Sequence, residues 1–336
     1  MDYSELFLSL REPEKQTLSE SIYLNAKLLY KLAEEGFSKN YKPLLTDDYY
    51  PEERIVKWLD VLSQTPGYKW FKGRFRPALH DISNIPEDGS LLVSNHNSLF
   101  IGDVAPIYLG MYEKRRRVVY GLGHNLLKDS DFMKSVGGTH GRKVTAIKLL
   151  DEDKYALVCP EGALGAGRSK LHAYHVRPIE GFSYDGLGYL KVAYRSNKPI
   201  IPIGSVGGEE TSLVLANIKP EINFLFNTLE DKLNISQTFL GNLCLDLIKG
   251  TKLVPLLLAP PLPLKIDAYV GKPIEIKDFV DERERQIDYY KANMYIMNEI
   301  QKLIDKGLEK RSTLLLKFYQ NLRKLSIMVD AKDNIF

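Results

Sequence analysis

The spacing of hydrophobic and polar positions changes twice along this chain. From about residue 15 to 65, apolar residues recur at helical spacing, interrupted near Asp47–Pro51 by residues suited to a helix start. From about residue 75, short apolar runs alternate with helical patterns, and from about Asp281 the helical spacing returns. The pattern therefore predicts an N-terminal helical region at 1–74, an α/β domain at 75–280 and a C-terminal amphipathic helical region at 281–336.

Short apolar runs bounded by turn-forming residues predict the strands of the middle region. Helical patterns fall between these runs, and this alternation is typical of a mostly parallel sheet. The predicted fold class is therefore α/β, with a mostly parallel central sheet flanked by helices, an N-terminal helical segment and C-terminal helices. The predicted strands are Ser90–Ser94, Arg117–Leu122, Tyr155–Cys159, Pro199–Ser205 and Lys265–Val270, and the helices between them include Arg142–Leu150 and Tyr189–Ser196.

A histidine follows the first of these strands, in the sequence Ser94-Asn95-His96-Asn97-Ser98. Open α/β sheets bind ligands at the carboxyl ends of their strands, and an imidazole there can take a proton from a hydroxyl near neutral pH. Asp103 is the nearest carboxylate downstream, but seven residues on a straight helix span roughly 10.5 Å. A contact with His96 therefore requires residues 97–102 to fold back as a loop. The alternative is that Asp103 only caps a helix that begins near Val104.

A second strand ends in Pro160-Glu161-Gly162, and a glycine-rich stretch continues to Arg168. A glycine-rich turn after a strand exposes backbone N–H groups, which can bind an anion or a developing oxyanion. The glycine spacing matches neither a Walker-type phosphate loop nor a Rossmann fingerprint. Glu161 is a candidate site residue because it lies at the same predicted sheet edge as His96. The alternative is a buried glutamate that accepts hydrogen bonds from turn amides.

Charge and hydropathy narrow the function classes. The formal net charge of +3 is too small to indicate a nucleic-acid partner. The first residues lack the features of a signal peptide, and no apolar run approaches the ~20 residues that span a bilayer, so we expect neither element. The longest apolar stretch, Leu253–Leu264, contains four prolines. It is either a buried extended segment or an apolar loop that dips into a lipid surface.

The cysteines and the remaining histidines are further candidates for catalytic or metal-binding residues. Cys159 and Cys244 are far apart in the sequence, which favours a reducing compartment, and Cys159 is either a buried strand residue or a nucleophile. His172 and His175 stand three residues apart without an evident third ligand, which favours a packing role. We expect no metal site.

Two basic segments each allow a structural and a functional interpretation. The cluster Lys114-Arg115-Arg116-Arg117 is either a solvated turn or a binding site for CoA phosphates or an acidic carrier protein. The stretch 302–324 combines lysines and arginines with leucines at helical spacing. It is either a helix packed on the domain with a solvated basic face, or a surface that contacts anionic lipid headgroups.

Several motifs in a fixed order resemble the glycerolipid acyltransferase superfamily, which includes lysophosphatidate acyltransferases. Further details resemble its monoacylglycerol-acyltransferase-like branch, and the resemblance covers about Asp81 to Ile276. The motifs that carry the superfamily resemblance are Asn95-His96, Gly137 to Arg142, Pro160-Glu161-Gly162 and Pro199-Ile200-Ile201-Pro202-Ile203. The branch is indicated by Gly165 and Gly167-Arg168 after Glu161-Gly162, by Val206-Gly207-Gly208-Glu209-Glu210 and by Val270-Gly271-Lys272-Pro273-Ile274.

The resemblance implies roles for individual residues. It makes His96 the general base, and it places an orienting aspartate five residues later, where this chain has Ile101; Asp103 takes that role here. It further implies that Glu161 and Gly162 shape the acceptor or oxyanion site, and that Arg142 matches an arginine linked to the acceptor phosphate. A further arginine of the family is replaced by Leu164, and Arg168 can supply the guanidinium instead. The expected catalytic residues are His96 and Asp103, and the expected substrate-binding residues are Asn95, Arg142, Glu161, Gly162 and Arg168.

The implied activity is direct transfer of a fatty acyl group from acyl-CoA or acyl carrier protein to a hydroxyl of a glycerolipid or lysophospholipid-type acceptor. This is an O-acyltransferase of EC 2.3.1 type that uses no cofactor or metal besides its acyl co-substrate. We expect it on the cytoplasmic face of a membrane, as a peripheral protein without a nucleic-acid partner. Two alternatives remain: a thioesterase or esterase, although no Gly-x-Ser-x-Gly motif is present, and a non-catalytic acyl-CoA- or lipid-binding protein.

Overall fold

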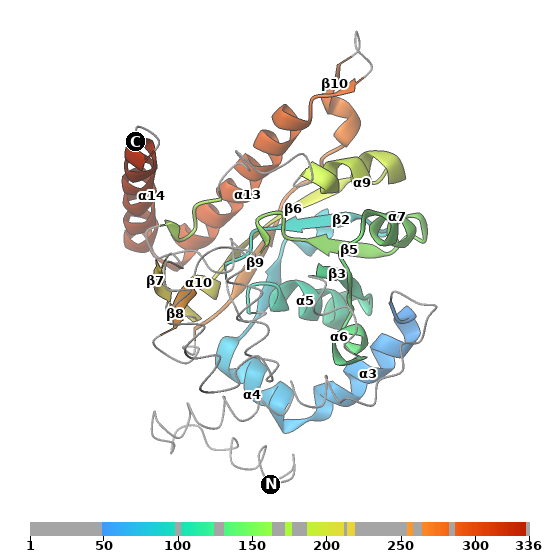
Figure 1. Cartoon of the computed structure of the whole chain (residues 1–336). Helices are drawn as coiled ribbons and strands as arrows, with labels where there is room; N and C mark the ends of the chain where they lie inside the picture. Colours follow the sequence, from blue (N-terminus) through green and yellow to red (C-terminus); the bar gives the residue numbers. More distant parts are fainter. Residues whose placement is uncertain are drawn as a thin grey trace, which may run out of the picture.

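A seven-stranded sheet forms the centre of the protein, with the strand order β1-β9-β6-β2-β5-β3-β4 (Figure 1). The computed structural model describes residues 49–97, 102–123, 131–162, 172–176, 187–211, 214–218, 254–257, 264–281 and 286–333. Neighbouring strands of this sheet are parallel except β6 and β9. The predicted α/β fold with a mostly parallel sheet is therefore confirmed. The strands are β1 (Ala78–His80), β2 (Leu91–Ser94), β3 (Val119–Gly123), β4 (Gly138–His140), β5 (Tyr155–Val158), β6 (Ile200–Val206) and β9 (Asp267–Val270).

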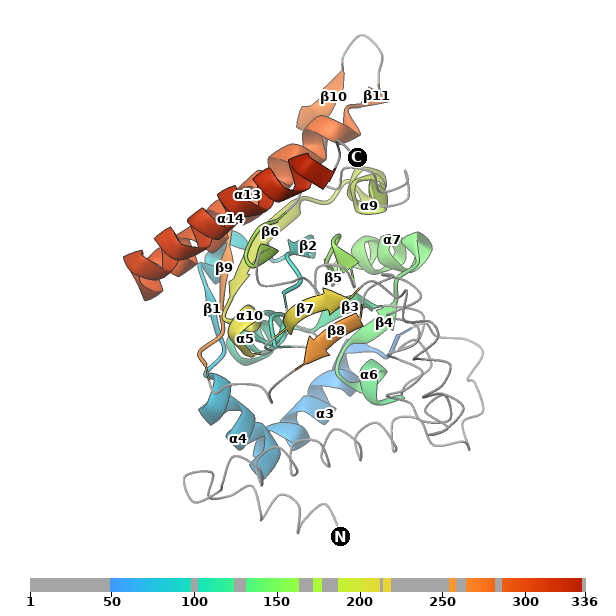
Figure 2. The same cartoon turned by 60° about the vertical axis from the view of Figure 1, so that its left-hand side comes forward.

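Helices cover both faces of the sheet, which explains why its central strands are continuous apolar runs. Leu92 of β2 packs in a cluster with Ile107 and Met111 of α5 (Ala105–Arg115). Its neighbours Leu91 and Val93 pack in a second cluster with residues of α7 (Lys143–Asp151), α9 (Gly188–Ser196) and α13 (Tyr289–Arg311). Figure 2 shows α7, α9 and α13 on one side of the strands and α5 on the other. Successive residues of one strand thus serve two cores, because side chains alternate between the faces of a sheet.

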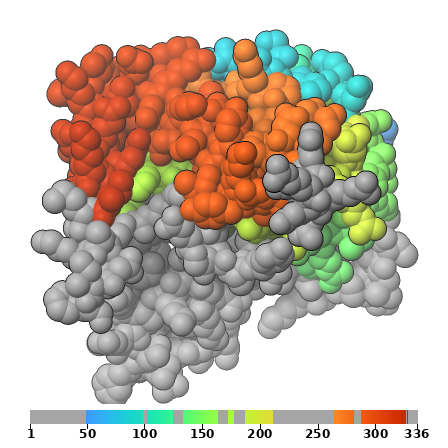
Figure 3. All heavy atoms as spheres, turned by 90° about the horizontal axis from the view of Figure 1, so that it is seen from above, coloured from blue at the N-terminus to red at the C-terminus, as the bar shows by residue number. Residues whose placement is uncertain are grey.

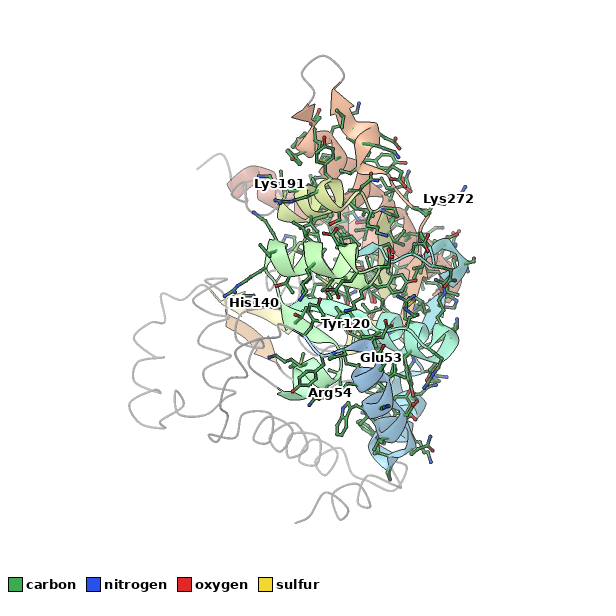
Figure 4. The ribbon with its side chains drawn as sticks, turned by 90° about the vertical axis from the view of Figure 1, so that its right-hand side faces the viewer. Glu53, Arg54, Tyr120, His140, Lys191 and Lys272 are labelled. Atoms are coloured by element: carbon green, nitrogen blue, oxygen red, sulfur yellow. The ribbon has the colours of Figure 1, made fainter. Side chains whose placement is uncertain are left out.

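Within the described part of the chain, the sheet is preceded by α3 (Glu52–Gln64) and α4 (Pro66–Phe75). The segment before α3 is anchored to the start of β3, because the Tyr120 hydroxyl donates to the Tyr50 carbonyl at 3.0 Å. The Val118 N–H also donates to the Glu52 carboxylate at 2.7 Å. Figure 4 labels Tyr120 on this strand and His140 at the β4 end of the sheet. These bonds place α3 beside the amino end of β3, away from the edge where His96 lies.

The remaining elements are short. They are α6 (Asp131–Ser135), α10 (Gly208–Thr211), the 3-10 helices η2 (Ile82–Asn84) and η8 (Ile276–Phe279), and the two-stranded sheets of β7 (Val214–Ile218) with β8 (Val254–Leu257) and of β10 (Val280–Asp281) with β11 (Gln286–Ile287). Part of the proline-rich stretch 253–264 is therefore extended, as β8, while residues 258–263 lie outside the described residues. The lipid-contact interpretation of this stretch stays a prediction.

The C-terminal helices are α13 and α14 (Thr313–Asp333). Helix α13 crosses β6 closely: a Cβ added to Gly204 would lie 2.6 Å from the Leu303 Cβ, so glycine is required at this crossing. Within the described residues, no helix is both long enough and apolar enough to cross a membrane. The proposed domain boundaries at 74/75 and 280/281 stay predictions.

Candidate active site

Three adjacent strands, β5, β2 and β6, end at one edge of the sheet and supply the polar residues of the site. His96 lies two residues beyond β2, and Glu161 lies three residues beyond β5. Ser205 is near the end of β6, which leads into the turn Gly207–Gly208. The carboxyl ends of parallel strands meet at one edge, so residues more than a hundred positions apart in sequence become neighbours.

His96 and Asp103 form the central pair. The His96 Nδ1 lies 2.6 Å from the Asp103 Oδ2, and the side chains are 27% and 0% exposed, respectively. An ionised carboxylate only accepts hydrogen bonds, so Nδ1 carries the ring proton and donates it to Asp103. The Nε2 atom is then unprotonated and can act as a base on the partly exposed imidazole.

The pairing requires the chain to turn back between the two residues, and the described residues next to each of them bind the same carboxylate. The Asn97 N–H donates to the same Asp103 Oδ2 at 2.7 Å, and the Val104 N–H donates to Oδ1 at 3.0 Å. Helix α5 begins one residue later than expected, with Val104 rather than Asp103 at its N-cap position. The Asp103 carboxylate thus holds both ends of the loop as well as the imidazole. The interpretation in which it serves only as a helix cap does not fit these contacts.

Two asparagines on either side of His96 attach this segment to β6. The Asn95 Nδ2 donates to the Ser205 carbonyl at 3.1 Å, and the Ser205 N–H donates to the Asn95 Oδ1 at 2.8 Å. The Asn97 Nδ2 donates to the same carbonyl at 3.0 Å, and the Ser205 hydroxyl donates to the Asp103 carbonyl at 2.7 Å. All four residues are buried. The Asn95 side-chain amide therefore binds the backbone of Ser205 in this structure. The substrate-binding role expected for Asn95 from the sequence stays a prediction.

Glu161 supports His96 from the opposite side. Its Oε2 accepts the backbone N–H of His96 at 3.1 Å, so Glu161 contacts the candidate catalytic segment directly. Gly162 has φ +55°, and its N–H donates to the Cys159 carbonyl at 2.9 Å within the turn. Because this N–H already has an acceptor, it is not available as an oxyanion donor in this conformation. Whether other amides of this glycine-rich stretch can bind an oxyanion stays a prediction, because residues 163–171 lie outside the described residues.

The two predicted guanidinium groups lie differently. Arg142 is exposed at the N-cap position of α7, directly after β4, and its N–H donates to the His140 carbonyl at 2.8 Å. Strand β4 is three strands from β2 in the sheet, about 14 Å at the usual strand spacing. The structure therefore places Arg142 along the same edge without bringing it into contact with His96. Arg168 lies outside the described residues.

Cys159 ends the third of the predicted strands and is a poor nucleophile. Burial raises the pKa of its thiol well above the ordinary value, and the nearby Asp103 and Glu161 carboxylates raise it further. A thiolate is the reactive form, so the raised pKa makes this thiol less reactive near neutral pH than an ordinary cysteine. The Cys159 Sγ lies 3.9 Å from the Asn95 carbonyl oxygen, as expected for a packed residue.

The basic cluster Lys114–Arg117 serves the fold. Lys114 donates to the Leu79 carbonyl at 2.6 Å, and Arg115 donates to the carbonyls of Ile85 and Ile82, both at 2.8 Å. Arg116 pairs with Asp60 at 2.7 Å and Arg117 with Glu52 at 3.0 Å. The cluster precedes β3 and so lies at the opposite edge of the sheet from His96. These contacts favour a structural role, in which the cluster anchors neighbouring segments, over a binding site for the acyl donor.

The turn after β6 is held by a carboxylate between two buried tyrosines. The Gly207 N–H donates to the Tyr174 hydroxyl at 2.6 Å, and this hydroxyl donates to the Glu210 carboxylate. The Tyr319 hydroxyl of α14 donates to the other Glu210 oxygen at 2.9 Å. Burial raises the pKa of both tyrosines, and the charge of Glu210 raises it further, so both hydroxyls stay protonated as donors. Sequence reasoning missed this cluster, because its members come from three distant segments.

A second histidine–aspartate pair lies outside the site. The His80 Nε2 is 2.7 Å from the Asp267 Oδ1, and its ring stacks on Tyr269 at a centroid distance of 4.5 Å. Lys265 and Arg311 also contact Asp267, at 2.8 and 3.2 Å. His172 and His175 lie one turn apart, and among the described residues no group of three or more His, Cys, Asp or Glu side chains is placed to hold a metal.

Comparison with known proteins finds distant relatives. No family model matches the chain. An uncharacterized protein of Mycobacterium tuberculosis is 25% identical over 157 residues, which cover 45% of this chain and 42% of that protein. An uncharacterized protein of Mycobacterium leprae is 26% identical over 157 residues, covering 45% and 41%. Phytyl ester synthase 2, chloroplastic, of Arabidopsis thaliana is 23% identical over 254 residues, which cover 70% of this chain and 34% of that protein.

A solved structure is also similar: the 1-acyl-sn-glycerophosphate (LPA) acyltransferase PlsC from Thermotoga maritima. Its TM-score is 0.41 at 17% identity, and the match covers 87% of this chain and 90% of that chain. The chain resembles glycerolipid acyltransferases. The chain spans less than half the length of the curated relatives that it matches.

Proposed function

We propose that this protein is an acyl-CoA- or acyl-carrier-protein-dependent O-acyltransferase of EC 2.3.1 type. Its acceptor is a hydroxyl group of a glycerolipid or lysophospholipid-type molecule, and His96 is the general base. The observation that carries the proposal is the 2.6 Å pair of His96 and Asp103 at the edge where three strands end. The similarity to proteins named for acyl transfer and ester synthesis supports the reaction type.

The proposed reaction is a direct transfer. The His96 Nε2 takes the proton of the acceptor hydroxyl while the hydroxyl oxygen bonds to the thioester carbonyl carbon. The carbon–sulfur bond then breaks, and the imidazolium returns its proton to the leaving thiolate, which gives an ester and a free thiol. Asp103 keeps the proton on Nδ1 and stabilises the imidazolium that forms in between.

The described side chains near His96 favour direct transfer over a covalent acyl-enzyme. Ser94 is fully buried in β2, and the raised pKa of Cys159 keeps that thiol protonated. With neither group available as a nucleophile, the acceptor hydroxyl itself is the species that His96 activates. If water took the place of this hydroxyl, the reaction would be hydrolysis of the thioester. Acyl transfer and hydrolysis therefore differ only in whether an alcohol or water occupies the acceptor site.

The test is acyl transfer from radiolabelled palmitoyl-CoA and palmitoyl-acyl carrier protein to a panel of acceptors. The panel contains lysophosphatidate, glycerol 3-phosphate, monoacylglycerol, diacylglycerol and a long-chain alcohol, the last suggested by the relative named phytyl ester synthase. The variants are His96→Ala and the matched control His80→Ala, which removes the other histidine of a histidine–aspartate pair.

We expect ester formation on at least one acceptor, a loss of more than ~100-fold in His96→Ala, and a rate within about threefold of wild type in His80→Ala. Free fatty acid as the sole product would instead identify a thioesterase. Donor binding without product from either donor would identify a binding protein. Equal rates in wild type and His96→Ala would exclude His96 as the base.

The proposal also includes the location of the enzyme. Glycerolipid acceptors reside in membranes, whereas acyl-CoA and acyl carrier protein are water-soluble donors. We therefore place the protein as a peripheral enzyme on the cytoplasmic face of a membrane, without a nucleic-acid partner. Membrane fractionation of cells that express the full chain tests this placement, with release by salt as the expected behaviour of a peripheral protein.

A further inference from the structure

Helix α14 carries an unusual combination of side chains. Between Thr313 and Val329 the sequence contains three cations and no aspartate or glutamate. One of these cations, Arg323, is directed inward and pairs with Asp305 at 2.8 Å. The other two, Lys317 and Lys324, are exposed, and neither forms an ion pair within the part of the chain that the structure describes.

Large apolar side chains lie on the outward face of the same helix. Leu314 is 78% exposed, Phe318 is 54% exposed and Leu325 is 50% exposed. They are spaced by four and seven residues, so they share one face of the helix over about 16 Å. Lys317 and Lys324 each precede a member of this set by one residue and therefore border it. We call these five residues the α14 stripe.

The α14 stripe is complementary to one kind of partner. An apolar row bordered by lysines, on a helix stretch that contains no aspartate or glutamate, matches a membrane interface that offers acyl chains below anionic headgroups. Isolated exposed apolar residues are common on protein surfaces, but three large ones aligned on one helix face with flanking lysines are not. Figure 3 shows the red of α14 at one corner of the molecule, with part of its surface open to the viewer.

The inward face of α14 is fixed next to the catalytic edge. The Tyr319 hydroxyl donates to Glu210, which is held in turn by Tyr174, and Tyr174 binds the Gly207 N–H. The next residue, Gly208, lies against the catalytic segment: a Cβ added there would lie 3.1 Å from the Asp103 Cβ. Figures 1 and 2 show α14 alongside α13 with α10 near one end. A membrane bound to the α14 stripe therefore lies on the β6 side of the catalytic edge.

We propose that the α14 stripe docks the protein on an anionic lipid surface and so presents the catalytic edge to acceptors in that membrane. This inference rests on the proposed function for the identity of the acceptor, but not for the docking itself. The apolar side chains and the two lysines make separate contributions to binding an anionic lipid surface. One double variant therefore removes two apolar side chains, and a second double variant removes the two lysines.

The experiment is flotation of the full chain with vesicles of pure phosphatidylcholine and of phosphatidylcholine with 30 mol% phosphatidylglycerol, at low salt. The apolar variant is Leu314→Ser/Phe318→Ser, and its control is Tyr194→Ser/Tyr290→Ser, which removes side chains that are 48% and 62% exposed on α9 and α13. The charge variant is Lys317→Gln/Lys324→Gln, and its control is Lys272→Gln/Lys277→Gln, which removes exposed lysines from the turn after β9 and from η8 (Figure 4 labels Lys272). Acyl transfer in detergent micelles is measured in parallel.

We expect wild type to float with the anionic vesicles and the apolar variant to bind at least tenfold more weakly. The charge variant should lose roughly fivefold per lysine on anionic vesicles only, and both controls should bind as wild type. Stripe variants that keep wild-type activity in micelles show that the protein is folded and that the loss concerns docking. Flotation of the stripe variants equal to wild type, or no flotation of wild type, would overturn the docking proposal. Normal flotation without any acyl transfer would instead overturn the proposed function.

Discussion

The His96 Nδ1 lies 2.6 Å from the Asp103 Oδ2, although the two residues stand seven positions apart in a segment that could have continued as one helix. The Asn97 N–H binds the same carboxylate oxygen and so holds the residue after His96 at Asp103. The carboxylate is fully buried, so water does not compete for it. The orientation of the His96 imidazole is therefore set by contacts within the protein.

Replacement of Asp103 by asparagine should reverse the tautomer at the cost of one contact, because an amide nitrogen at the Oδ2 position cannot accept the Asn97 N–H. The side-chain amide can donate to Nδ1, and the ring proton then occupies Nε2, where the base must be free. We expect kcat to fall by about 10³- to 10⁴-fold, with a much smaller change in KM. Steady-state kinetics measures this, and Asp267→Asn at the other histidine–aspartate pair is the control. An equal loss in both variants would show a general effect on folding.

Two substitutions of Glu161 distinguish support of His96 from contact with the acceptor. In wild type the His96 N–H lies 3.1 Å from the Glu161 carboxylate. Glu161→Gln keeps an oxygen that can accept this N–H, so we expect kcat within about tenfold of wild type. Glu161→Ala removes this acceptor and should lower kcat substantially further. If the negative charge instead contacts the acceptor, both variants will raise KM to a similar degree.

The local pattern predicted the fold class because the central strands are apolar on both faces. Leu91–Val93 and Ile200–Ile203 are recognisable without any knowledge of their neighbours. Strands β1 and β4 were missed, because Ala78–His80 and Gly138–His140 are three residues long and lack an apolar run. The antiparallel direction of β9 was also unpredictable, since it depends on which strand it pairs with rather than on its own residues.

The position of a residue at the sheet edge was predictable where it follows a strand directly, as His96 and Glu161 do. The contacts of Asn95 with Ser205 were not predictable, because they span 110 residues. A hydrogen bond of that separation leaves no periodicity in the sequence. The same reason applies to Tyr174, whose hydroxyl joins the turn after β6 to Glu210.

The clamp between Asn95 and Ser205 should contribute to stability. Asn95→Ala removes two hydrogen bonds between buried groups and leaves the Ser205 N–H without its acceptor. A buried N–H without an acceptor costs about 1–3 kcal/mol, and the second lost hydrogen bond adds to this cost. We therefore expect the free energy of unfolding to fall by about 2–4 kcal/mol. Urea denaturation measures it. The exposed Asn321→Ala is the matched control and should change stability by less than about 0.5 kcal/mol.

A methyl group at Gly208 should disturb the site from behind. An added Cβ would lie 2.0 Å from the Asn97 Oδ1 and 3.1 Å from the Asp103 Cβ, so the catalytic loop must shift. We expect Gly208→Ala to lower kcat by at least tenfold, measured with the best acceptor of the panel. Gly73→Ala in α4 is the control, because nothing lies within 4 Å of its added Cβ. It should raise the free energy of unfolding by about 0.5–1 kcal/mol and leave kcat unchanged. If Gly208→Ala and Gly73→Ala have similar kcat values, the turn at Gly208 does not affect the site.

The pH dependence of Cys159 alkylation tests whether this thiol has any catalytic role. Burial and two nearby carboxylates raise its pKa, so the thiolate fraction at pH 8 is smaller than for an ordinary cysteine of pKa about 8.5. In a Cys244→Ser background, the rate of reaction with iodoacetamide should increase about tenfold per pH unit from 7 to 9.5 without a plateau. The same chain unfolded in urea should reach a plateau in that range. We expect Cys159→Ala to retain kcat within about threefold, because the proposed transfer never bonds the acyl group to sulfur. Loss of activity in step with alkylation at pH 7 would instead make the thiol the nucleophile.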